Sequence, residues 1–116
     1  MFLPVHTRVF LAVGSTDMRK AINGLSILVE DRLQLDPFSG SLFVFCNRRK
    51  NMIKILYWDR NGFCLWHKRL EKHVFTWPDS REEVIRIDPR QLDWLLEGLD
   101  IGIFSSHQAL HYSTTI

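Results

Sequence analysis

Three strand-like runs follow one another in the middle of the chain, at residues 42–46, 52–58 and 63–70. They are rich in Phe, Val, Ile and other residue types that strands favour. Asn61 and Gly62 separate the second run from the third, and both tolerate the positive φ angles of a tight hairpin turn. The order of the runs predicts an antiparallel β-meander. The run at 52–58, whose only charged member is Lys54, is expected to be a central strand.

Shorter apolar segments on either side extend this meander. Residues 8–13 form an apolar run that ends at a Gly-Ser turn, which is typical of a buried strand, and residues 84–87 are a further candidate strand. Thr16 or Asp17 is expected to cap a helix that follows, which places Arg19 and Lys20 in its first turn. The helix is predicted from an apolar stripe at three- to four-residue spacing, formed by Met18, Ile22, Leu25, Val29 and Leu33.

Two Asp-Pro pairs mark the limits of the helical patterns. Pro37 restrains Asp36 from helical angles, so the first helix stops before this pair. Asp88 and Pro89 suit the N-cap and the first position of a short C-terminal helix, which we expect to end at Gly102. The predicted fold class is α+β. It comprises an antiparallel β-meander of about four to five strands, one amphipathic helix packed on it and a short C-terminal helix.

The length of 116 residues fits one domain, which we expect to cover residues 1–102. Residues 103–116 show no clear period and are expected to be a poorly ordered tail or a segment that docks on a partner. No window approaches the roughly 18 apolar residues of a membrane span, and the first residues lack the pattern of a secretory leader. A cytoplasmic location without membrane contact is therefore expected. Cys46 and Cys64, both in strand-like runs, are expected to be buried free thiols.

Charge is distributed unevenly along the chain, although the net charge is only +2. Residues 1–45 hold four basic and four acidic side chains (0), residues 46–75 hold eight and two (+6), and residues 76–116 hold three and seven (−4). The basic block is interleaved with Tyr57, Trp58, Trp66 and Trp77. Cations neutralise phosphates and aromatic faces stack on exposed bases, so this combination is typical of nucleic-acid binding. The predicted contact residues are Arg48, Arg49, Lys50, Lys54, Arg60, Lys68, Arg69 and Lys72.

The same composition also fits a sheet whose aromatic side chains form the core and whose cations face water. The register of the hairpin favours binding. If Asn61 and Gly62 form a two-residue turn, Lys54 lies opposite Arg69. Two like charges in this position repel each other unless an anion lies between them. This register therefore predicts an anion such as phosphate at the surface of the hairpin.

No pattern in the sequence indicates an enzyme, a cofactor or a metal centre. There is no nucleophile elbow, phosphate-binding glycine loop or dinucleotide fingerprint. Cys64 and His67 have a ligand-like spacing, but residues three apart on a strand point to opposite faces. His107 and His111 would share a helix face but lack a third ligand. We therefore expect a non-catalytic protein without cofactor or metal.

Several separated motifs occur in the order of a known family. They are Thr16-Asp-Met-Arg-Lys20, Asn23-Gly-Leu25, Asp36-Pro-Phe-Ser-Gly40, Leu42-Phe-Val-Phe45, Lys54-Ile-Leu-Tyr-Trp-Asp59 and Lys68-Arg-Leu-Glu71. They resemble the TnpB accessory family of the insertion sequence 66 transposons, the product of the second reading frame. The similarity runs from about Val9 to Asp100. It departs from the family pattern at Lys72-His73 and after Asp100.

The resemblance implies a role in transposition beside a separate, larger transposase that performs strand transfer. It brings no catalytic residue with it. Two hypotheses follow: an accessory protein that binds transposon DNA through the basic hairpin, or an adaptor that assembles the transposase through apolar surfaces or the acidic C-terminal helix. An RNA-binding sheet face is a third possibility. The oligomeric state has no signature in the sequence.

Overall fold

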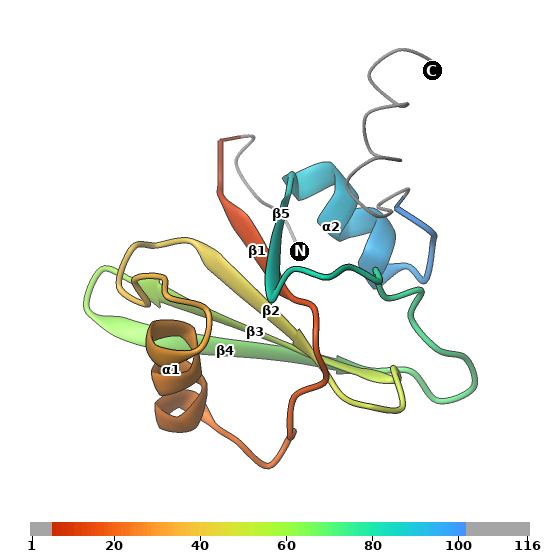
Figure 1. Ribbon diagram of the computed structural model, residues 1–116, viewed down its shortest axis with the longest axis horizontal. Coiled ribbons are helices and arrows are strands. Elements are labelled where there is room, and N and C mark those ends of the chain that lie inside the picture. Colours follow the sequence, from red (N-terminus) through yellow and green to blue (C-terminus); the bar gives the residue numbers. More distant parts are fainter. Residues whose placement is uncertain (1–5, 102–116) are drawn as a thin grey trace.

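The computed structural model describes residues 6–101, in which five strands form one mixed sheet in the order β4-β3-β2-β1-β5 (Figure 1). In chain order the elements are β1 (Val9–Ala12), α1 (Ile22–Asp31), β2 (Leu42–Cys46), β3 (Met52–Asp59), β4 (Gly62–Arg69), β5 (Val84–Ile87) and α2 (Pro89–Leu96). The predicted tail at 103–116 lies outside the described residues. The predicted α+β class is confirmed, with α1 packed on the sheet and α2 as the short C-terminal helix.

The three central runs pair as predicted, since β2, β3 and β4 form an antiparallel meander with β3 in the middle. The sheet as a whole is mixed because β1 runs parallel to β2, with Val9 opposite Leu42. A parallel pair needs a long crossover connection, and α1 lies in that crossover. The strand at 84–87 is confirmed as β5, which pairs antiparallel with β1 and forms the other edge of the sheet.

The turn between β3 and β4 differs from the prediction. Arg60 and Asn61, not Asn61 and Gly62, are the two residues between the strands, because Asp59 pairs with Gly62. Arg60 takes the positive φ angle, 56°, and the Asn61 amide donates to the Asp59 carbonyl oxygen at 2.5 Å. A non-glycine residue with positive φ is uncommon, and the local sequence pattern favoured its neighbours.

The predicted pairing of Lys54 with Arg69 is therefore wrong. Lys54 lies opposite His67, and Arg69 lies opposite Met52. In this register no second cation lies opposite Lys54 or Arg69, so the hairpin needs no anion between them. A shift of two residues leaves every side chain on its face, so Tyr57 and Trp66 still share one face of the sheet.

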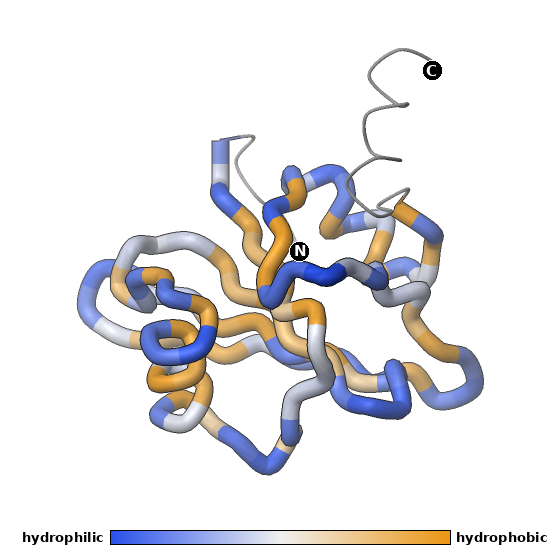
Figure 2. Tube along the Cα trace, viewed as in Figure 1, coloured by the Kyte–Doolittle hydropathy of each residue, from blue (hydrophilic) through white to orange (hydrophobic). Residues whose placement is uncertain are grey.

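Helices and loops cover the two faces of the sheet, and each face has its own core. On one face α1 buries Leu25 and Val29 against Phe43, Phe45 and Leu56. On the other face, Leu92, Leu95 and Leu96 of α2, with Phe75 and Trp77 from the segment before β5, cover alternate residues of the same strands. Figure 2 shows the corresponding pattern, with hydrophobic stretches along the strands and hydrophilic stretches at the turns. The alternation of strand side chains thus supplies both cores.

The start of α1 corrects the predicted cap. The helix begins at Ile22 after Ala21, which makes no side-chain capping bond, so neither Thr16 nor Asp17 is the cap. Residues 16–20 instead form a separate turn, in which the Lys20 amide donates to the Asp17 carbonyl oxygen at 3.1 Å. Arg19 and Lys20 therefore precede the helix.

The start of α2 matches the prediction, because Asp88 is the N-cap and Pro89 the first residue. The Asp88 carboxylate accepts from the Gln91 amide at 2.8 Å, and the Asp88 amide donates to the Gln91 side chain at 2.9 Å, which completes a capping box. The helix ends at Leu96, before the predicted position. Gly98, with φ of 87°, takes the left-handed position that follows it, and Gly102 lies outside the described residues.

Both cysteines are free, as predicted. Cys46 is buried, and burial raises the pKa of its thiol to about 11, whereas Cys64 is only half-buried. Within residues 6–101, no helix is long and apolar enough to span a membrane.

We predict that Asp88→Ala lowers the free energy of unfolding by about 0.5–2 kcal/mol, because the Gln91 amide loses its acceptor. Asp88→Asn is the matched control and should retain most of the stability, since its side-chain oxygen can still accept. Urea denaturation followed by circular dichroism measures both. Equal losses in the two variants would contradict a capping role.

Candidate nucleic-acid interface

Five of the eight predicted contact residues gather at one end of the sheet. Three of them, Arg48, Arg49 and Lys50, stand in the β2–β3 loop, while Arg69 ends β4 and Lys72 follows it. The segment after β4 is tied to this loop, because the Leu70 amide donates to Asn51 O at 2.8 Å and the Phe75 amide to Lys50 O at 2.7 Å. Arg60 is separate, since it lies in the turn at the opposite end of β3.

Two other predicted contact residues have structural partners. Lys54 Nζ donates to the carbonyl oxygens of Met18 and Lys20, at 2.8 and 3.1 Å, and so fixes the 16–20 turn to the sheet. Lys68 Nζ donates to the carbonyl oxygen of Leu96 at 2.9 Å, at the C-terminus of α2, where a cation is favourable. Both ammonium groups connect elements of the fold.

The β2–β3 loop is held in one shape by the side chain of Asn47. Asn47 Oδ1 accepts from the amides of Asn51 and Met52, at 3.0 and 3.1 Å, and its Nδ2 donates to Asn51 Oδ1 at 2.7 Å. Lys50 has a φ of 62°, which completes the tight turn. Arg48 and Arg49 are exposed, and no side-chain partner for Arg48, Arg49 or Lys50 occurs between residues 6 and 101. The loop presents three adjacent cations on a fixed backbone.

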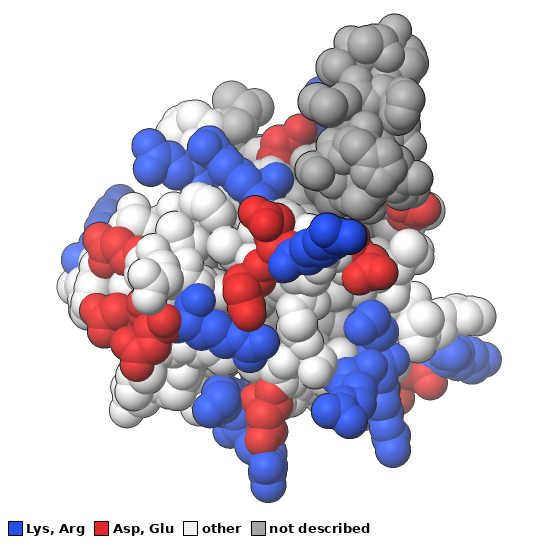
Figure 3. All heavy atoms as spheres, in the orientation of Figure 1, with Lys and Arg blue, Asp and Glu red and all other residues white. Residues whose placement is uncertain are grey.

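The 16–20 turn lies beside this loop, because the Thr16 amide donates to Cys46 O at 2.8 Å. Together they border an open groove of about 1040 Å³, which Asn47, Met52 and His67 also line. Its charged residues are Arg19, Arg48, Arg49 and Lys54 against one carboxylate, Asp17. Figure 3 shows Lys and Arg side chains projecting over this end of the molecule, with an acidic side chain among them.

Asp17, the one carboxylate that lines the groove, forms an ion pair with Arg19. Asp17 Oδ2 accepts from Arg19 at 2.7 Å, and Asp17 Oδ1 accepts from the Arg19 amide at 2.9 Å. These hydrogen bonds from Arg19, first of all the side-chain bond, hold the pKa of Asp17 well below its usual range. Asp17 is thus an anion that orients Arg19, whose side chain is 91% exposed. Arg19 and His67 also line the groove but were not among the predicted contact residues, and the Thr16-Asp-Met-Arg-Lys20 motif was the available signal for Arg19.

The aromatic side chains of the basic block lie away from the groove. Trp77 is buried and its Nε1 donates to Val13 O at 3.1 Å. Tyr57 and Trp66 pack against the core that faces α2. Trp58 contacts Phe38 and Phe63, with ring centroids 5.1 and 5.0 Å apart. Packing accounts for these aromatics, so the groove offers cations and not stacking surfaces.

Cys64 and His67 point to opposite faces of β4, as the strand alternation predicted, because their partners Tyr57 and Lys54 do so. The part of the chain that the structure describes contains no group of three potential metal ligands.

Residues 7–105 match the family described as IS66 Orf2 like protein. The chain belongs to this family. The predicted resemblance is therefore confirmed, and the protein is an IS66 Orf2-like transposon accessory protein. Two curated relatives come from Sinorhizobium fredii (strain NBRC 101917 / NGR234). Uncharacterized protein y4hO is 41% identical over 82% of this chain and 83% of its own, and uncharacterized protein y4jC is 34% identical over 80% of each. No solved structure matches the chain.

We predict that Lys54→Met lowers the free energy of unfolding by about 1.5–3 kcal/mol, because the carbonyl oxygens of Met18 and Lys20 lose a charged donor. Lys72→Met is the matched control and should change stability by less than about 0.5 kcal/mol, as is usual at an exposed position. Chemical denaturation measures both variants. Equal stability of the two would show that the Lys54 bonds do not hold the turn.

Proposed function

We propose that this IS66 Orf2-like protein binds DNA non-catalytically during transposition, through the groove between the 16–20 turn and the β2–β3 loop. The observation that carries the proposal is the placement of Arg48 and Arg49, which line the groove, and of Lys50 next to them, three cations without side-chain partners among the described residues on a fixed loop. Arg19 extends this positive surface across the groove. The partner in this proposal is the DNA of the transposon.

The chemistry of the groove favours contacts to the sugar-phosphate backbone. Arginine presents a planar fork of donors that suits phosphate oxygens, and each neutralised phosphate releases counterions. Such contacts fix the position of a protein on DNA and carry no sequence information themselves. The groove therefore supports binding that depends strongly on salt and weakly on sequence.

The contact set is narrower than the eight residues predicted from the sequence. Arg48 and Arg49 line the groove, Lys50 follows them in the same loop, and Arg69 and Lys72 lie at the same end of the sheet. Lys54 and Lys68 serve the fold, and Arg60 is remote. Arg69 also has a partner, since its Nε donates to Glu71 Oε2 at 3.1 Å.

An adaptor that assembles the transposase is the second candidate, and exposed apolar side chains near the end of α2 favour it. Trp94 is 41% exposed and Leu99 is 50% exposed. A pull-down of the transposase after nuclease treatment tests this role. Co-purification that requires Trp94 and Leu99 would support the adaptor, whereas capture only in the presence of DNA would refute it.

We predict that changing Arg48, Arg49 and Lys50 together to Ala weakens binding to duplex DNA and lowers the slope of log affinity against log salt by up to about 2.7, at about 0.9 for each phosphate contact. Fluorescence anisotropy with transposon-end and unrelated duplexes, at several salt concentrations, measures both quantities.

The matched control removes three other exposed cations, Arg8, Arg86 and Arg90, so the two variants have the same net charge. Arg8 lies beside the start of β2, the end remote from the groove, because the Leu42 amide donates to Arg8 O at 2.9 Å. This control should retain the salt slope. An equal loss of salt slope in the two variants would show that net charge alone causes the effect, and it would refute DNA binding at the groove.

A second comparison uses the two ends of one hairpin. Arg49→Ala should weaken DNA binding and lower the salt slope by about 0.9, whereas Arg60→Ala, at the opposite end of β3, should leave both unchanged. The same anisotropy titration distinguishes the two. A larger effect at Arg60 would place the DNA at the tip of the hairpin instead.

A further inference from the structure

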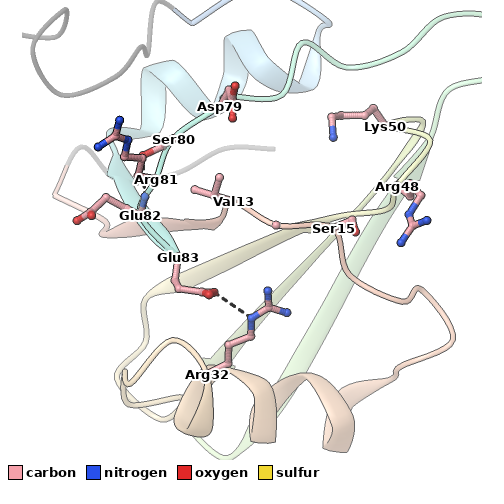
Figure 4. A pocket seen from close by; sticks show the side chains of 11 residues that line it. Val13, Ser15, Arg32, Arg48, Lys50, Asp79, Ser80, Arg81, Glu82 and Glu83 are labelled. Carbon is pink, nitrogen blue, oxygen red and sulfur yellow. Dashed lines mark hydrogen bonds and ion pairs between the residues drawn. The ribbon is translucent and has the colours of Figure 1, made fainter.

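A second hollow, of about 410 Å³, lies on the other side of the β2–β3 loop (Figure 4). Arg48 lines both this hollow and the groove, so the two share one wall. The opposite wall comes from the segment before β5, and the floor includes Gly14 and Ser15, which follow β1. Its donors and acceptors decide what it can bind.

The backbone at 13–16 is fixed on both sides of this floor. The Val13 amide donates to Glu83 O at 3.0 Å, and Val13 O accepts from Trp77 Nε1 at 3.1 Å. At the other end the Thr16 amide donates to Cys46 O at 2.8 Å. Between these anchors, the amides of Gly14 and Ser15 and the Ser15 hydroxyl have no hydrogen-bond partner within the described range of 6–101. Two adjacent backbone donors are thus held in place without an acceptor.

Arg32 is held close to the same two residues. Its Nε donates to Glu83 Oε2 at 3.0 Å, which leaves the two terminal nitrogens without a protein partner among residues 6–101. A Cβ atom added at Gly14 would lie 3.0 Å from Arg32 Nη2, so the absence of a side chain at position 14 makes this approach possible. The ion pair with Glu83 therefore holds the guanidinium beside Gly14.

The charges around the hollow are mixed, since four cations and three carboxylates line it. Figure 4 shows Arg32 and Lys50 reaching toward the space beside Ser15, whereas Arg81 and Glu82 point away from it. Of the three carboxylates that line the hollow, Glu83 is paired with Arg32, and Asp79 belongs to the wall formed by the segment before β5. An ammonium, a guanidinium, a hydroxyl and two backbone amides form a set that suits a tetrahedral oxyanion.

We propose that this hollow is a phosphate-binding site formed by Arg32, Lys50 and the Gly14-Ser15 backbone. The chemistry is that of a phosphate monoanion or dianion. The assignment of this phosphate to a DNA strand that continues from the groove past Arg48 rests on the proposed function. The phosphate site itself does not, because free inorganic phosphate presents the same oxygens.

The test is a titration of the full-length ¹⁵N-labelled protein with inorganic phosphate, followed by the amide resonances of Gly14 and Ser15. We expect saturable shifts at both amides. Arg32→Gln should weaken this binding by at least about tenfold, since it removes a charged donor. Arg81→Gln is the matched control, because it removes the same charge from a residue that lines the hollow and points away. The absence of shifts, or equal losses in the two variants, would overturn the site.

A DNA titration of the same variants separates this inference from the proposed function. Weaker binding of both phosphate and DNA in Arg32→Gln would support a site for the DNA backbone. Loss of phosphate binding with unchanged DNA affinity would support the site for free phosphate and overturn its assignment to DNA. Phosphate shifts in a protein that binds no DNA would refute the proposed function and leave the phosphate site standing.

Discussion

The parallel pairing of β1 with β2 is the constraint on which the rest of the molecule depends. Parallel neighbours place their carboxyl ends at the same edge of the sheet, so the segment that follows β1 must meet the loop that follows β2. The two segments are joined there by a hydrogen bond from the Thr16 amide to Cys46 O. The groove and the second hollow both lie there, and α1 follows on the way back to the start of β2. The candidate site is thus a consequence of strand direction as much as of basic residues.

The sequence predicted what depends on near neighbours. The Asp88 capping box spans three residues, and the strand runs carry their own alternation, so both were accessible from local pattern. The hairpin register was not, because Arg60 adopts a positive φ angle that its residue type does not favour. The direction of β1 relative to β2 has no local signature either.

The roles of the cations show the same limit. Lys54 and Lys68 look like their neighbours in the basic block, yet their acceptors lie 34 to 36 and 28 residues away in the sequence. Only the fold brings these carbonyl oxygens within reach. Conversely, Arg19 and Arg32 lie outside the basic block of residues 46–75 in the sequence but close to it in the fold. Arg19 lines the groove and Arg32 lines the second hollow. The distribution of charge along the chain marks residues 48–50 as a dense cationic segment. It does not show which residues from other parts of the chain lie around that segment in the fold.

The proposed DNA interface lies at the end of the sheet where β1 and β2 terminate. The most direct measurement is a titration of the ¹⁵N-labelled full-length protein with a short duplex, followed residue by residue in amide spectra. We expect the shifts to concentrate at residues 13–19 and 47–52. Shifts concentrated at the turn around Arg60, or along α2, would contradict it.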